Sequence, residues 1–168
     1  MRRAALLLLS LCLTACGISL PDDDRSTPRL EQIELPDGFR IEVFADQLPE
    51  ARSMALSAKG TLFVGTRDTD RVYALRDVDD DGRADSVYTI ASDLNTPNGV
   101  AVHDGALYVA EISRILRFDN IEVRLDNPPE PVVVTDAFPG DEHHGWKYIA
   151  FGPDDHLYVP VGAPCNIC

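Results

Sequence analysis

The chain has 168 residues, and 45% of them are apolar, which is enough for the core of a soluble globular domain. Its 28 Asp and Glu residues outnumber its 15 Lys and Arg residues, so the formal net charge is −13. This balance argues against nucleic acid as a partner and against electrostatic attachment to an anionic membrane surface, because both require a basic face. A neutral or cationic partner fits the overall charge better.

The first residues have the features of a secretory signal. A pair of arginines precedes an apolar run over residues 4–13 that is too short to span a bilayer as a helix. The run ends in Leu-Thr-Ala-Cys-Gly at residues 13–17, which resembles the bacterial lipobox, where the cysteine thiol is acylated. We therefore expect a lipoprotein signal peptide over residues 1–15, a lipid anchor on Cys16 and an exported protein at the outer membrane or the periplasmic face. An ordinary signal peptide with a chance cysteine is the alternative.

Residues 16–34 contain several aspartates and prolines, which predicts a solvated acidic tether before a folded domain over residues 35–168. The cysteines left in that domain are Cys165 and Cys168. A local disulfide between them is the simpler interpretation in an oxidising compartment. The same spacing attaches c-type haem where a histidine follows, and this alternative stays open.

One short block occurs in three copies along the chain. In each copy an apolar-Ala-apolar triplet and a turn precede a Leu-aromatic-Val triplet, whose leucines are Leu62, Leu107 and Leu157. These leucines are 45 and 50 residues apart, which is the period of β-propeller blades and too long for a single hairpin. With the β-branched runs between the copies, strands are expected over residues 54–56, 62–64, 71–75, 86–90, 100–102, 107–109, 114–118, 132–135, 149–151 and 157–159.

The repeat predicts an all-β fold of β-propeller type, in which each unit has four antiparallel strands. The chain is expected to hold roughly the first two blades and part of a third. Arg40–Asp46 resembles the outer strand Ser86–Asp93 but has no inner strands before it, so it is expected to close a further blade. Because propellers need at least about four blades to close, we expect a piece of a longer protein.

An acidic loop separates the third and fourth strands of the first unit. Its carboxylates alternate along the chain, at Asp77, Asp79, Asp81 and Asp85. Ca²⁺ takes six to eight oxygen ligands, so these carboxylates and the Arg83 carbonyl are expected to hold it while Gly82 makes the turn. The EF-hand's twelfth-position glutamate is absent, because Tyr88 stands there. A solvated acidic loop without a metal is the alternative.

The inner strands of a propeller line its central channel, so the loops that lead into them are expected to face a ligand pocket. Asn98 precedes the inner strand of the second unit, and residues 142–147, Glu-His-His-Gly-Trp-Lys, precede that of the third. A histidine there can act as a general base, and Trp146 can stack on a planar ligand. The alternatives are a turn residue for Asn98, solvated or metal-binding histidines beside Glu142, and a core position for Trp146.

The stretch His144–Asp154 and the pair Cys165 and Cys168 resemble the glucose/sorbosone dehydrogenase family, most closely its sorbosone dehydrogenase-like branch. The similarity runs over residues 35–168. Members are six-bladed propellers that oxidise sugars or related carbonyl and hydroxyl compounds with pyrroloquinoline quinone (PQQ). The resemblance therefore implies PQQ as the cofactor, a sugar or aldehyde as the substrate, and a cytochrome or quinone as the electron acceptor.

On the same resemblance, His144 is the base that takes the substrate's hydroxyl proton, and Asn98, His143 and Lys147 contact the cofactor. Lys147 keeps a positive charge where the branch often has arginine, and His143 replaces an acidic residue of the soluble glucose enzymes. The leading hypothesis is a PQQ-dependent sugar dehydrogenase. Two alternatives stay open: a calcium-dependent gluconolactonase-like hydrolase, which Pro97–Val102 resembles, and a non-catalytic propeller at the cell envelope.

Overall fold

The computed structural model describes residues 30–163 and 165–167. All of its strands lie in the compact unit that begins at Glu34, and Leu30–Gln32 form a short 3-10 helix, η1, in the preceding unit. The predicted signal peptide, the lipid anchor at Cys16 and the tether up to residue 29 lie outside the described residues. In the part of the chain that is described, no helix is long and apolar enough to cross a bilayer.

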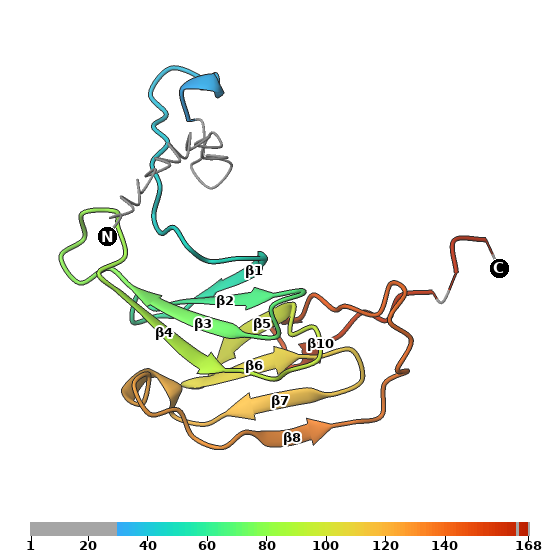
Figure 1. Cartoon of the computed structure of the whole chain (residues 1–168). Helices are drawn as coiled ribbons and strands as arrows, with labels where there is room; N and C mark the ends of the chain where they lie inside the picture. Colours follow the sequence, from blue (N-terminus) through green and yellow to red (C-terminus); the bar gives the residue numbers. More distant parts are fainter. Residues whose placement is uncertain (1–29, 164, 168) are drawn as a thin grey trace, which may run out of the picture. The chain divides into compact units, whose positions relative to one another are not determined.

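The first two units of the repeat each form a four-stranded antiparallel sheet with its strands in chain order (Figure 1). The first sheet contains β1 (Ala51–Leu56), β2 (Leu62–Thr66), β3 (Val72–Arg76) and β4 (Ser86–Ala91). The second contains β5 (Gly99–His103), β6 (Ala106–Ala110), β7 (Ile115–Phe118) and β8 (Val132–Thr135), with the 3-10 helix η2 (Ile121–Val123) between β7 and β8. The prediction of four antiparallel strands in each of these units is confirmed.

The strand registers show that the copies of the repeat are structurally equivalent. The leucine that opens the second strand lies opposite the last residue of the apolar triplet, as in Leu62 with Leu56 and Leu107 with Val102. The third copy repeats this pairing in a short hairpin, β9 (Ala150–Phe151) and β10 (Leu157–Tyr158), where Leu157 lies opposite Phe151. Residues at the same distance from each triplet therefore occupy matching places in successive units.

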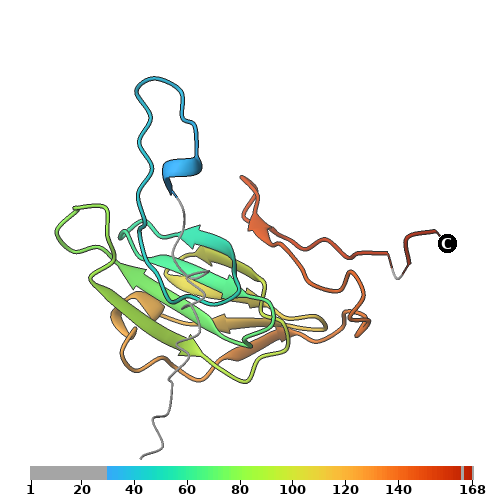
Figure 2. The same cartoon turned by 45° about the horizontal axis from the view of Figure 1, so that its top comes forward.

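The two four-stranded sheets pack face to face, as Figures 1 and 2 show. The core between them is built from alternate strand residues, among them Phe63, Val72 and Ala74 of the first sheet and Leu107, Val109 and Phe118 of the second. Such side chains alternate across a strand, so each sheet also has a second apolar face. On the second sheet that face packs against Phe151 and Leu157 of the β9–β10 hairpin. This packing brings the inner strands of successive units together.

The structure differs from the prediction at Arg40–Asp46, which does not form a strand. An extended segment becomes a strand only when a neighbour pairs with its backbone, and none of the described strands does so. Phe44 and Ala45 instead pack on the outer face of the first sheet, against a cluster that includes Val64 and Tyr73. The Phe44 carbonyl also accepts a hydrogen bond of 2.8 Å from the Ala84 amide, and closure of a further blade by this segment stays a prediction.

Candidate functional site

One pocket collects residues from the beginnings of the inner strands of all three repeat units. It has a volume of about 440 Å³ and is lined by Arg52, Ser53, Asn98, His144, Trp146, Tyr148, Pro160, Val161 and Gly162. The structure therefore places the predicted residues Asn98 and His144 in the same pocket, together with Trp146. Their elements are far apart in the sequence, and the stacking of the units brings them together.

Hydrogen bonds between neighbouring inner strands hold Asn98 in place. The Ser53 hydroxyl donates to the Asn98 carbonyl, and Asn98 Nδ2 donates to the Lys147 carbonyl over 2.8 Å. Asn98 is only 5% exposed, so its amide has a defined orientation. The segment before it is anchored by the buried Glu111, whose Oε1 accepts a hydrogen bond of 2.6 Å from the Asn95 amide. Asn98 is thus both a link between units and part of the pocket wall.

The ring of His144 is oriented by a backbone carbonyl. His144 Nδ1 lies 3.2 Å from the Ala163 carbonyl oxygen. A carbonyl oxygen can only accept a hydrogen bond, so in a neutral ring this contact requires the tautomer that carries the proton on Nδ1 and the lone pair on Nε2. Gly162 lies so close to the His144 carbonyl that a Cβ would come within 2.2 Å of it. The backbone on both sides therefore restricts this histidine, and in that tautomer Nε2 is the nitrogen that can act as a general base.

Trp146 lies between a histidine and an arginine. Its ring meets that of His144 edge to face, with centroids 6.4 Å apart and an interplanar angle of 77°. The guanidinium carbon of Arg67, which follows β2, lies 4.6 Å from the centroid of the Trp146 ring. This is a cation–π geometry, and it fixes the orientation of the indole in the pocket wall.

Arg52 is a pocket residue that the sequence analysis did not identify. It lies two residues before the first apolar triplet, in the place that Asn98 and Lys147 occupy in the second and third units. The pairing of β1 with β2 shifts register between Ala51 and Met54, and such irregularities redirect the side chains at that point. Alignment of the three copies indicates Arg52, because it places this residue at the same position as Asn98 and Lys147.

Lys147 has a different place from Asn98 and His144. Its ammonium group donates to the Ile112 carbonyl and, over 2.8 Å, to the Gly145 carbonyl, and the residue is only 2% exposed. Burial lowers the pKa of Lys147, because desolvation disfavours the charged form. The residue lines a neighbouring cavity of about 220 Å³ together with His143. The Lys147 ammonium group, which was expected beside the cofactor, therefore binds backbone carbonyls and lies outside the pocket that holds His144.

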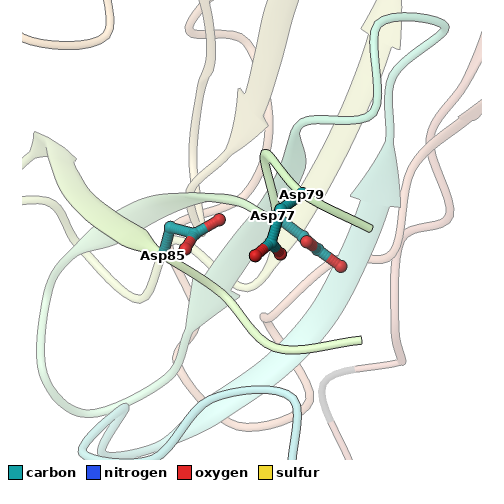
Figure 3. A group of neighbouring side chains, drawn as sticks. All are labelled: Asp77, Asp79 and Asp85. Carbon is teal, nitrogen blue, oxygen red and sulfur yellow. The ribbon is translucent and has the colours of Figure 1, made fainter. Parts of the chain in front are cut away.

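The predicted calcium loop lies between β3 and β4, as expected. Carboxylate oxygens of Asp77, Asp79 and Asp85 lie within 4.8 Å of one another. Figure 3 shows the Asp85 carboxylate directed toward the other two from the opposite arm of the loop. Asp81 is not part of this group, and its Oδ1 accepts a hydrogen bond from the Arg83 amide over 2.8 Å. The structure thus gathers three of the four predicted carboxylates, an oxygen-rich donor set that suits a hard cation.

Repulsion within this loop changes the acidity of one carboxyl group. The pKa of Asp79 is raised, first by the charge of Asp81 and then by those of Asp85 and Asp77. A divalent cation would relieve this repulsion.

Near the C-terminal end of the described residues, Cys165 is disulfide-bonded, and its predicted partner Cys168 lies outside them.

A family model described as "Domain of unknown function (DUF7133)" matches residues 26–166. Among solved structures, the holo form of the pyranose dehydrogenase PQQ domain from Coprinopsis cinerea is similar, with a TM-score of 0.70 and 16% identity. The match covers 80% of this chain and 33% of that one. The calcium structure of a Trichoderma reesei protein of Carbohydrate-Active Enzymes Family AA12 has a TM-score of 0.66 and 18% identity, over 78% of this chain and 34% of that one.

The PQQ-bound form of an aldose sugar dehydrogenase from Streptomyces coelicolor is also similar. It has a TM-score of 0.55 and 22% identity, and the match covers 73% of this chain and 40% of that chain. The present chain therefore spans between 33% and 40% of the length of these proteins. At such identities the likeness shows the fold, and it confirms the all-β fold of β-propeller type.

Proposed function

The chain belongs to the DUF7133 family, and from this starting point we propose that it forms part of a PQQ-dependent oxidoreductase acting on a sugar or a related hydroxyl or aldehyde compound. The observation that carries the proposal is the pocket in which His144, Asn98 and Trp146 meet. The holo pyranose dehydrogenase domain and the PQQ-bound aldose sugar dehydrogenase support the assignment of the quinone. Within this class, the stretch His144–Asp154 favours the sorbosone dehydrogenase-like branch.

The residues of the pocket fit a planar, carboxylated quinone. Trp146 offers an aromatic plane and Asn98 a buried amide, and no acidic residue lines the pocket to repel an anion. An aromatic face is a suitable contact for a flat ring system. Trp146 and Asn98 would hold PQQ, which when bound supplies a two-electron acceptor for substrate oxidation.

The chemical role of the protein itself lies with His144. The Ala163 carbonyl holds the proton on Nδ1, so Nε2 is the atom that accepts the proton of a substrate hydroxyl group. Trp146 supports the ring edge to face, and Gly162 restricts the backbone of His144. The site thus presents an oriented base before the substrate arrives, which lowers the cost of reaching the reactive geometry.

The first test replaces the proposed base. We expect this chain alone to be inactive, so the assay uses the full-length protein that contains it. With added PQQ and Ca²⁺, that protein should reduce a redox dye in the presence of an aldose, and His144→Ala should lower kcat by about 10²–10⁴-fold, the usual contribution of a general base. His156→Ala is the matched control, because this exposed histidine contacts Asp154 in the β9–β10 turn and does not line the pocket. Activity that is independent of quinone, or unchanged in His144→Ala, would refute the proposal.

The same assay separates the two alternatives. A gluconolactonase-like enzyme would hydrolyse a lactone with Ca²⁺ alone, without quinone and without dye reduction. A non-catalytic envelope propeller would do neither. Quinone-dependent dye reduction is therefore expected of only one of the three hypotheses.

We also propose that the loop between β3 and β4 binds Ca²⁺ through Asp77, Asp79 and Asp85, a proposal that the calcium structure of the AA12 protein supports. Calorimetric titration of the wild-type protein with CaCl₂ should give one saturable binding event. Asp79→Asn should weaken it at least about tenfold, because one ligand charge is lost. Asp126→Asn, a substitution of an exposed aspartate after η2, should leave binding unchanged. Equal heats for the wild type and Asp79→Asn would exclude this loop.

A further inference from the structure

The pocket that holds His144 has a local charge opposite to that of the chain. The chain carries 28 acidic residues and a formal net charge of −13, yet none of the nine residues that line the pocket is acidic. Its ionisable members include Arg52 and His144, and Arg67 stacks on the ring of Trp146, which lines the pocket. A cationic or neutral ligand gains nothing from a pocket wall without acidic residues. An anion does gain, because it avoids there the repulsion that it meets elsewhere on the acidic surface.

Arg52 is free to bind such an anion. Its side chain is exposed and makes no ion pair or hydrogen bond with any residue that the structure describes. By contrast Lys147, at the matching place in the third unit, donates its hydrogen bonds to two carbonyls, and Asn98 in the second unit donates to the Lys147 carbonyl. Among the residues at these three positions, Arg52 is therefore the one whose polar group has no partner among the described residues. A guanidinium group binds a carboxylate with two parallel hydrogen bonds.

Arg67 adds a second cation at the same wall. It stacks on Trp146 at 4.6 Å, and its ion pair with Asp68 is long, with Nε 3.5 Å from Oδ1, and solvent-exposed. Exposed pairs of this kind hold a charge weakly. Arg67 therefore fixes the indole and keeps a positive potential beside the pocket, while Arg52 provides the direct contact.

We infer that Arg52 recognises a carboxylate of the substrate, so that the pocket selects an acidic sugar such as a uronic acid over the neutral sugar with the same ring. The inference rests on the proposed function, because His144 takes its proton from the substrate and the groups that share its pocket meet that substrate. The quinone also carries carboxylates, so the test must distinguish these two sources of the same chemistry.

Trp146 is the single tryptophan of the chain and a wall of the pocket, so its fluorescence reports binding without any redox reaction. The purified protein is titrated with D-glucuronate, with D-glucose and, in a separate experiment, with PQQ. Glucuronate should bind at least about tenfold more tightly than glucose, since a charge-assisted hydrogen bond contributes that much. Arg52→Gln should abolish this preference, and Arg52→Lys, which keeps the charge, should retain part of it.

Arg124→Gln is the control, because Arg124 is an exposed arginine after η2 and does not line the pocket. It should bind both sugars as the wild type does. Equal affinities of the wild type for glucuronate and glucose would overturn the inference, and this result needs no variant to fold. Weaker binding of PQQ alone in Arg52→Gln, with the glucuronate preference intact, would also overturn it. A glucuronate preference without quinone-dependent dye reduction would refute the proposed function and leave the carboxylate site standing.

Discussion

At the scale of single residues, the lysine of the third unit shows how burial changes a role. Lys147 is buried, and its ammonium group donates hydrogen bonds to two backbone carbonyls rather than to a carboxylate. No ion pair with an acidic residue is found for it among the described residues. Such a group stabilises the loop around it through its hydrogen bonds and through the Phe138 ring, whose centroid lies 5.3 Å from Nζ, because burial itself opposes the charge.

Replacing this lysine should therefore destabilise the protein. Lys147→Met keeps the stem but leaves the Ile112 and Gly145 carbonyls without their donor, at a cost of about 1–3 kcal/mol in the free energy of unfolding. Urea denaturation provides the measurement. Lys59→Met is the matched control, since Lys59 is the other lysine of the chain and is exposed. Equal losses in both variants would show that the buried ammonium has no special role.

The pH dependence of stability follows from the lowered pKa of Lys147. The unfolded chain protonates this lysine with the ordinary pKa of 10.5, and the folded protein has a lower one. Between these two values the unfolded state binds more protons, so the free energy of unfolding rises as the pH rises through this window. Lys147→Met should lose that rise. A wild type and variant with parallel pH profiles up to pH 10.5 would contradict the assignment.

At the scale of elements, the close approach of the inner strands decides where glycine is required. A Cβ on Gly99, the first residue of β5, would lie 2.5 Å from the Lys147 carbonyl oxygen, and one on Gly65 in β2 would lie 2.3 Å from that of Asn98. These carbonyls accept the hydrogen bonds of Asn98 and Ser53. Backbone contact and hydrogen bonding between units therefore occur at the same points, next to the pocket.

Gly99→Ala should separate the second and third units. The added methyl group cannot avoid the Lys147 backbone without moving a strand, so we expect a loss of about 1–3 kcal/mol in the free energy of unfolding. Gly140→Ala is the control, because no atom lies within 4 Å of its Cβ position. Urea denaturation of both variants tests the prediction, and an unchanged midpoint for Gly99→Ala would contradict the packing of β5 on Lys147.

At the scale of the whole molecule, the stacking of units creates the site. The sheets bury the apolar residues between them, and the same stacking aligns the starts of three inner strands around one cavity. The first two units contribute Arg52 and Asn98 from matching places, and the third contributes His144 from the loop that precedes its inner strand. The units share one strand pattern but carry different polar residues where their inner strands begin. A chain that is acidic overall therefore forms a pocket without acidic residues.

The sequence alone determined the strands and their order, because each copy of the repeat carries its own alternation and turn residues, and these are local signals. It also placed Asn98 and His144 at matching strand beginnings. The loop at Asp77, Asp79 and Asp85 was visible from the spacing of its carboxylates. The anchor at Cys16 stays a prediction, since it lies outside the described residues.

Only the tertiary structure decided which side chains share the pocket. Side-chain direction depends on contacts between units that are distant in the sequence, such as Asn98 Nδ2 with the Lys147 carbonyl and the Lys147 ammonium with Ile112. For this reason Lys147 is committed to the interior and Arg52 is exposed to the pocket, although both are basic residues at equivalent positions. A local pattern specifies a strand, whereas the partner of a charged group depends on what the packed neighbours leave unsatisfied.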